Sequence, residues 1–236
     1  QFNLGVMYRK GQGVEQDFME ATKWFRKAAE QGIANAQYAL GLMYEKGQGV
    51  GPDFKQAVKW YRKAADQRFA ESQTNLGFMY VKGQGVERDF KEAFKWFQKA
   101  ADQGVAVAQN ALGLMYEKGQ GVEQDFKEAV KWYQKAADQG NAIAQANLGW
   151  MYDLGKGVPE DNKKAFEWYS KAAAQNHAVA QNSVGNMYDT GQGVKQDFKE
   201  AFKWYQKAAD QGQTRAQTSL GVMYRNGKGV KQDFKE

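Results

Sequence analysis

The chain has 236 residues, of which 42% are hydrophobic, 14% aromatic and 25% charged, a composition that excludes a disordered polypeptide. It has no cysteine and one histidine, His177, which excludes a disulfide scaffold, a thiolate metal site and almost every histidine-based metal or catalytic pair. The net charge of +6 is moderate and suits an acidic partner or simply solubility. No apolar run is long enough for a transmembrane helix. We expect no metal and no cofactor.

Tryptophan and glycine recur along the chain at intervals of 36 residues. The tryptophans are Trp24, Trp60, Trp96, Trp132, Trp168 and Trp204, and the glycines are Gly5, Gly41, Gly77, Gly113, Gly149, Gly185 and Gly221. A strict period of this length is typical of a helical solenoid, so we expect a single repeat array over residues 1–236. The units are 1–36, 37–72, 73–108, 109–144, 145–180 and 181–216, followed by a partial unit at 217–236.

Each unit is predicted to contain two helices, and the unit at 109–144 is representative. Its first helix is expected to begin near Ala106 and to end at Gly119, where a left-handed residue can close it. One face of this helix is formed by residues at i, i+3, i+4 and i+7: Gln109, Leu112, Gly113 and Tyr116. A glycine inside a helix costs up to about 1 kcal/mol relative to alanine. Its recurrence in all seven units predicts a close helix crossing at Gly113 and its equivalents.

The second helix of the same unit is predicted to begin at Asp125, with Glu128 at the capping-box spacing. Its buried stripe follows a period of 3.6 residues and comprises Phe126, Ala129, Val130, Tyr133, Ala136 and Ala137. Gly140 is expected to close the helix. Asn176 occupies the equivalent position in the fifth unit, and Arg68 occupies it in the second, where a left-handed conformation would be strained or the cap changed.

The repeated pattern AQxxLGxMYxxGxGVxxDxxxAxxWxxKAAxxG covers the whole chain, for example at Ala108–Tyr116 and at Lys131–Ala137. It closely resembles the Sel-one-like repeat, a relative of the tetratricopeptide repeat. The resemblance implies an all-α, right-handed α-solenoid of helix-turn-helix repeats whose first helices line a concave surface. It also implies a role as a protein-binding scaffold or adaptor, and seldom as a catalyst. Members that carry a cysteine pair in each repeat are excluded because this chain has none.

No group of residues in the sequence predicts catalysis. Gly155-Lys156 and Gly227-Lys228 look like the end of a phosphate-binding loop, but no Ser or Thr follows either lysine and no strand precedes the glycines. His177 occupies a position that varies freely between units, so a structural role is favoured. The aspartates at the starts of the second helices are explained as N-caps. The six periodic tryptophans are expected to pack on the next unit.

Lysines on the outer face of the second helices offer one candidate surface. They recur at i, i+4 and i+8 as Lys91/Lys95/Lys99, Lys127/Lys131/Lys135 and Lys199/Lys203/Lys207. Such a convex ridge could bind a nucleic acid or an anionic lipid surface. A solvated face is favoured instead, because Glu92 and Asp102 supply counter-charge to Lys95 and Lys99. We also expect no aromatic side chain to accompany the lysines, as base stacking would require.

The first helices offer the second candidate surface, a peptide-binding groove. An apolar row that varies in size between units is predicted to face away from the partner helix, and asparagines stand one turn back from it. Asparagine side chains can pair with an extended peptide backbone, and tetratricopeptide-like repeats use them in this way. The alternative is that these side chains only fill space between first helices. The candidate partner-binding residues are Asn3, Leu42, Asn75, Phe78, Leu114, Asn147, Trp150 and Asn186.

The chain begins and ends within repeat units, and we therefore expect it to be a segment of a longer array. Apolar faces at Phe2, Leu4, Leu220 and Tyr224 are expected to be exposed, so end-to-end self-association is a further expectation. The absence of cysteines fits the cytoplasm and the bacterial periplasm equally, and the sequence names neither the compartment nor the partner.

Overall fold

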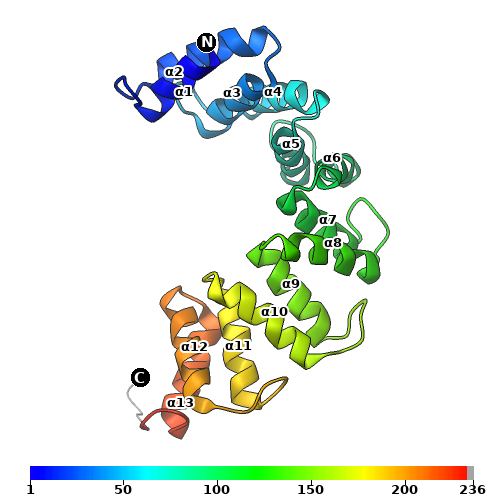
Figure 1. Cartoon of the computed structure of the whole chain (residues 1–236), viewed down its shortest axis with the longest axis vertical. Coiled ribbons are helices and arrows are strands. Elements are labelled where there is room, and N and C mark those ends of the chain that lie inside the picture. The colour runs from blue at the N-terminus through cyan, green and yellow to red at the C-terminus, as the bar shows by residue number, and fades with distance from the viewer. Residues whose placement is uncertain (233–236) are drawn as a thin grey trace. The chain divides into compact units, whose positions relative to one another are not determined.

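The computed structural model describes residues 1–232, which form thirteen α-helices and no strand (Figure 1). Two compact units divide the chain, Gln1–Gln124 and Asp125–Glu236, and consecutive helices pack together within each of them. The first unit contains α1 (Phe2–Lys10), α2 (Phe18–Glu30), α3 (Ala34–Lys46), α4 (Phe54–Asp66), α5 (Ala70–Lys82), α6 (Phe90–Asp102) and α7 (Ala106–Lys118). The second contains α8 (Phe126–Asp138), α9 (Ala142–Asp153), α10 (Asn162–Ala174), α11 (Ala178–Thr190), α12 (Phe198–Asp210) and α13 (Thr214–Asn226). The predicted all-α repeat fold is confirmed.

Each second helix, from α2 to α12, begins at an aspartate that caps it, as predicted. In α6 the Asp89 carboxylate accepts hydrogen bonds from the backbone N–H groups of Lys91 and Glu92 at 2.8 and 3.0 Å. The reciprocal half of the capping box is absent, because the Asp89 N–H donates instead to the carbonyl of Tyr80 in the first helix. Glu92 is therefore free to form an ion pair with Lys95 at 2.5 Å. The cap thus ties the second helix to the first helix of the same repeat.

The periodic glycine of the first helix lies against an aromatic ring of the second helix. A Cβ atom on Gly77 would lie 2.6 Å from the ring of Phe97, and one on Gly41 would lie 2.6 Å from the ring of Tyr61. Both distances are far inside van der Waals contact, so no side chain fits. Gly149 and Gly185 show the same arrangement. The predicted close crossing is therefore confirmed at these positions.

Three of the periodic tryptophans, Trp60, Trp96 and Trp204, pack on the two helices that precede their own, so the expectation that they pack on the next unit is wrong for them. Trp60 of α4 joins the core formed by α2 and α3, and Trp96 of α6 joins the core formed by α4 and α5. Trp96 directly precedes Phe97, which covers the glycine of its own repeat. One residue turns a helical side chain by about 100°, which directs Trp96 toward α4 of the preceding repeat, where it also contacts the core residues of α5.

At the C-terminal end, the expected exposure of Leu220 is wrong. Its side chain is only 8% exposed because it packs in the core between α12 and α13. Phe2, Leu4 and Tyr224 are half-buried rather than exposed. Self-association through the ends stays a prediction that sedimentation would test.

Candidate functional site

The candidate residues lie on the side of the first helices that we call the first-helix face, defined by the apolar row and the asparagines one turn back from it. In the first unit Leu42, Asn75, Phe78 and Leu114 are half-buried, whereas Asn3 is exposed. In the second unit Asn147 and Trp150 are half-buried and Asn186 is exposed. The face therefore combines side chains that already have packing partners with side chains that are open to solvent.

The largest residues of the row also contribute to packing. The Phe78 ring contacts the Phe97 ring edge-on, with 4.9 Å between ring centroids, so the expectation that the row lies clear of the partner helix is wrong here. The close approach at Gly77 is what brings Phe78 onto that ring. Trp150 packs against the core between α10 and α11, and the Lys156 ammonium lies 4.3 Å from the centroid of its indole.

Two cavities open on the first-helix face, one in each unit. The cavity in the first unit has a volume of about 270 Å³ and is mainly apolar; its lining is Phe2, Val6, Arg9, Phe25, Asn35, Tyr38, Ala39 and Phe69. The cavity in the second unit has a volume of about 410 Å³; its lining is Trp150, Asp153, Tyr169, Asn182, Ser183, Asn186, Met187, Tyr205, Arg215 and Ser219. The second cavity brings together two of the predicted residues, Trp150 and Asn186.

Buried tyrosine hydroxyl groups connect the second helices to this face. The Tyr61 hydroxyl donates to the Glu45 carboxylate, and Asn75 of the next repeat donates a hydrogen bond to the same hydroxyl. In the second unit the Tyr169 hydroxyl donates to Asp153 at 3.4 Å. Burial raises the pKa of Tyr61 and Tyr169 and also raises the pKa of the Asp153 carboxyl. Asn75, predicted to contact a peptide, thus already uses one amide N–H within the fold.

The sequence contains a signal for these tyrosine contacts, because three positions vary together between repeats. This signal is missed when each position is considered separately. Repeats with tyrosine have an acidic residue near the end of the first helix and an Asn or Ser at the position of Asn75 in the next repeat. Where the ring is Phe97, the corresponding residues are Val81 and Ala111, and where it is Phe25 they are Arg9 and Ala39. A buried hydroxyl requires hydrogen-bonding partners and a phenyl ring does not, which accounts for this co-variation.

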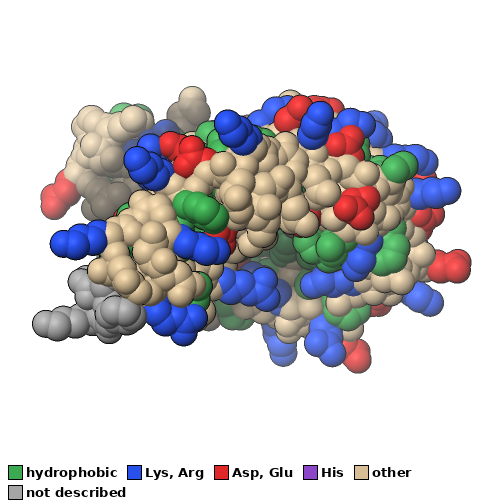
Figure 2. All heavy atoms as spheres, turned by 90° about the horizontal axis from the view of Figure 1, so that it is seen from below, with side chains coloured by type: hydrophobic (Ala, Val, Ile, Leu, Met, Phe, Trp, Pro, Cys, Tyr) green, Lys and Arg blue, Asp and Glu red, His purple; other side chains and the backbone are tan. Residues whose placement is uncertain are grey.

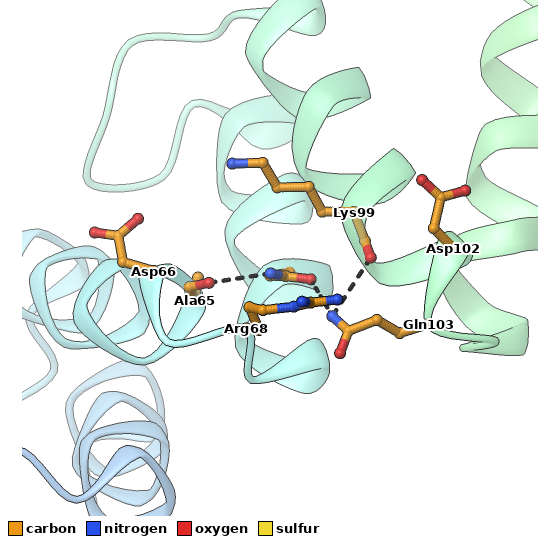
Figure 3. A pocket seen from close by; sticks show the side chains of 7 residues that line it. Ala65, Asp66, Arg68, Lys99, Asp102 and Gln103 are labelled. Atoms are coloured by element: carbon orange, nitrogen blue, oxygen red, sulfur yellow. Dashed lines mark hydrogen bonds between the residues drawn. The ribbon is translucent and has the colours of Figure 1, made fainter.

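A second feature missed from the sequence is a ladder of glutamines between repeats. The buried Gln73 amide donates to the carbonyl of Ala65 at 3.0 Å and accepts from the Gln103 amide at 2.7 Å (Figure 3). The same two contacts recur from Gln37 and Gln181, because the first-helix glutamine repeats every 36 residues. Each of these carbonyls, at the end of a second helix, also accepts a backbone N–H, as Ala65 does from Arg68 at 3.0 Å, so the glutamine adds a second hydrogen bond that joins neighbouring repeats.

The cavity drawn in Figure 3 lies beside this ladder and has a volume of about 360 Å³. Exposed side chains of both signs line it, with Arg68 and Lys99 set against Asp66 and Asp102. Its charges therefore balance, and its glutamines are already used between repeats. We assign it no ligand.

Arg68 has a φ of 66°, so it adopts the left-handed conformation, and the alternative of a changed cap is wrong. We expect Arg68→Gly to raise the free energy of unfolding by about 1 kcal/mol, because a left-handed conformation costs a non-glycine residue about 1–2 kcal/mol. Urea denaturation measures this change. Asn176→Gly is the control: Asn176 has the same φ of 66° but tolerates it better, and its side chain accepts from Gln181 at 3.1 Å. A larger gain at Asn176 than at Arg68 would contradict the assignment of strain.

Most of the lysine ridge is engaged within the protein. Lys95 forms its ion pair with Glu92, and the Lys99 ammonium lies 4.0 Å from the centroid of the Trp96 ring. Lys135 and Lys207 cover Trp132 and Trp204 in the same way, at 4.0 and 4.2 Å. The expectation that no aromatic accompanies the lysines is therefore wrong, because a lysine three residues after a tryptophan reaches over its ring. Figure 2 shows acidic side chains interspersed among the basic ones on the face in view.

His177 caps α11: the backbone N–H of Ala180 donates to its Nδ1 at 3.2 Å. Burial lowers the pKa of His177. No cluster of potential metal ligands occurs within residues 1–232. The histidine therefore has a structural role as a helix cap.

We expect stability to fall as the pH drops below about 6.5, the unperturbed histidine pKa. A lowered folded pKa favours the neutral imidazole in the folded state, so its contribution is present above that pH and is lost as the pH falls through the folded pKa. His177→Asn should remove this dependence, because Asn141 caps Ala144 at the equivalent position at 2.9 Å. Urea midpoints measured from about pH 7 to pH 5 test this. Equal slopes for both proteins would contradict the prediction.

The chain belongs to the Sel1 repeat family. The Sel1 repeat model matches residues 1–33, 34–69, 70–105, 106–141, 142–177, 178–213 and 214–236. Proteins of this family generally act as protein-interaction scaffolds and are typically not enzymes. No helix in the described part of the chain is long and apolar enough to cross a membrane. The comparison with curated proteins gave no match.

Solved structures support the same assignment. A protective antigen of uropathogenic Escherichia coli with an SLR fold is 40% identical, with a TM-score of 0.93 over 99% of this chain and 50% of that protein. A Sel1 repeat protein from Oxalobacter formigenes is 33% identical, with a TM-score of 0.88 over 98% of this chain and 91% of that one. An immunity protein from Pseudomonas aeruginosa is 26% identical, with a TM-score of 0.53, over 81% and 70%. The chain thus spans half the length of the Escherichia coli protein.

Proposed function

We propose that this chain is a non-catalytic scaffold that binds a peptide or an extended segment of a protein on its first-helix face. In the first unit the contact residues are Asn3, Leu42, Asn75, Phe78 and Leu114. In the second unit they are Asn147, Trp150 and Asn186. The family's general role as a protein-interaction scaffold supports the proposal.

The observation that carries the proposal is the cavity of about 410 Å³ in the second unit, which Trp150 and Asn186 line together. Trp150 departs from the 36-residue tryptophan series, so the stacking of repeats does not require an indole at this position. A large aromatic side chain at the edge of a cavity is the kind of residue that dominates interface energy. Asn186 stands in the same row where most other repeats have an apolar residue, and it is exposed.

The alternative, binding of an anionic surface by the lysine ridge, has less support. The ridge contains lysines such as Lys91 and Lys127 that form no ion pair within residues 1–232, but Lys95 pairs with Glu92, and the tryptophans beneath the ridge are buried or half-buried. Trp96 is 6% exposed, so it offers no ring on which a base could stack.

Peptides selected from a displayed random library against the immobilised chain test the proposal. We expect Trp150→Ala to weaken binding by about 2 kcal/mol or more while circular dichroism reports unchanged helicity. Asn147→Ala should cause a smaller loss, of about 1 kcal/mol. The matched control replaces Lys95, Lys99, Lys131 and Lys135 with glutamine, which should leave affinity unchanged. Loss of binding in that control, together with a steep salt dependence, would favour the anionic-surface alternative.

A further inference from the structure

The cavity of the second unit is polar where the corresponding surface of the first unit is apolar. On α11 three neighbouring positions of the first-helix face hold Asn182, Ser183 and Asn186. The equivalent residues on α3 are Tyr38, Ala39 and Leu42. The sixth repeat has therefore exchanged apolar surface for hydrogen-bonding groups. The hydroxyl of Tyr169 accounts for Ser183, because asparagine or serine accompanies tyrosine at this position. Packing between repeats does not account for Asn182 and Asn186, because α3 packs with Tyr38 and Leu42 at the equivalent positions.

Two groups in this cavity lack partners within the described part of the chain. The Oδ1 atom of Asn182 is buried and accepts no hydrogen bond, although a buried amide oxygen normally does. Arg215, which enters the same cavity from the first turn of α13, forms no ion pair with any carboxylate within residues 1–232. Its equivalents in the earlier repeats are Asn35, Glu71, Val107, Ile143 and Val179, so a cation at this position is particular to this site.

The remaining charged residue of the cavity is accounted for. Asp153 accepts the Tyr169 hydroxyl at 3.4 Å, as Glu45 accepts that of Tyr61 in the second repeat. Tyr205 accepts a hydrogen bond from Ser219. Asp189, the acid of the sixth repeat, does not line the cavity; it lies 3.9 Å from Lys228, and its Oδ1 atom accepts no hydrogen bond within the described residues. The requirements left unmet at the cavity are therefore a hydrogen-bond donor for Asn182 and a negative charge for Arg215.

We propose that this cavity binds an acidic side chain of the peptide, whose carboxylate pairs with Arg215 while a backbone N–H of the same peptide segment donates to Asn182 Oδ1. The proposal rests on the proposed function and adds the chemistry of the partner. A carboxylate matches the planar fork of a guanidinium, and a backbone N–H is the donor that every extended peptide supplies. Trp150 at the rim would contact the adjoining residue of the peptide.

The test uses the strongest peptide from the library selection, synthesised with a blocked C-terminal amide. Each of its Asp and Glu residues is replaced singly by Asn or Gln, and affinity is measured for the wild-type chain and for Arg215→Glu. We expect one replacement to weaken binding to the wild type roughly tenfold or more and to leave binding to Arg215→Glu unchanged. Asn182→Ala, which introduces the residue found at Ala146, should weaken binding severalfold.

Arg225→Glu is the control for a change of net charge on the same helix, and it should retain the preference for the acidic peptide. A glutamate at position 215 lies in the first turn of α13, where the helix dipole favours it, so urea midpoints should show that Arg215→Glu still folds. Selected peptides that depend on Trp150 but on no acidic residue would overturn this inference and leave the proposed function standing. A requirement for a free C-terminal carboxylate would also overturn it. Failure to select any peptide would contradict both.

Discussion

Replacing Trp96 with alanine is expected to lower the free energy of unfolding by about 3–5 kcal/mol, the usual cost of emptying a large aromatic site in a core. Trp96 is 6% exposed and closes the core between α4 and α5, while Lys99 covers its outer face at 4.0 Å. Because Trp96 packs on α4 of the preceding repeat as well as on α5 of its own, part of the loss falls on the contact between repeats. Urea denaturation followed by circular dichroism measures the change.

Trp96→Phe is the matched control for this prediction. The indole Nε1 of Trp96 is buried without a hydrogen-bond partner, so phenylalanine loses no hydrogen bond and keeps part of the packed ring. Trp96→Phe should therefore lower the free energy of unfolding markedly less than Trp96→Ala. Equal losses for the two substitutions would show that the packed ring contributes little, which would contradict the role assigned to the periodic tryptophans.

Replacing Gly77 with leucine is expected to destabilise the protein by about 1–3 kcal/mol through overpacking, and the same substitution at Gly221 should not. A Cβ atom at position 77 would lie 2.6 Å from Phe97, whereas one at position 221 would meet no atom of residues 1–232 within 4 Å. Both glycines occupy the same position of the first helix. Gly221→Leu should even raise the free energy of unfolding by up to about 1 kcal/mol, because leucine has a higher helix propensity than glycine. Thermal denaturation of the two variants measures the contrast.

If both leucine variants lose stability to the same extent, the glycine is required for a reason other than the close helix crossing. Substitution by alanine, whose side chain is smaller than that of leucine, helps to separate these explanations. Gly77→Ala adds only the Cβ atom whose clash with Phe97 is described above, so it should already be destabilising, whereas Gly221→Ala should be neutral or favourable.

The fold could be predicted almost completely from the sequence because the residues that cap, close and pack the helices recur in successive repeats. The aspartate caps, the left-handed closing residues and the close glycine crossing follow from local rules, and the structure confirms them. The direction in which Trp96 packs did not follow. A helical period identifies the face on which a side chain lies, but it does not say whether the preceding or the next helix pair covers that face.

The candidate site was less predictable because its residues take part in networks of several positions. Asn75 appeared free to bind a ligand because its position varies between repeats, yet it donates to Tyr61. Comparing positions jointly would have revealed that contact, since asparagine or serine accompanies tyrosine and alanine accompanies phenylalanine. The unpaired oxygen of Asn182 depends on what surrounds it, which no pattern in one sequence specifies.

Indole N–H resonances give the most direct test of where a partner binds. Of the seven tryptophans, the six periodic ones lie on second helices, each beneath the lysine three residues further along, and one, Trp150, lines the cavity of the second unit. In a titration of the labelled chain with a selected peptide, the account predicts that the Trp150 indole signal shifts and that the six periodic signals stay in place. Shifts of the periodic signals with an unmoved Trp150 signal would contradict binding on the first-helix face and place the partner on the lysine ridge.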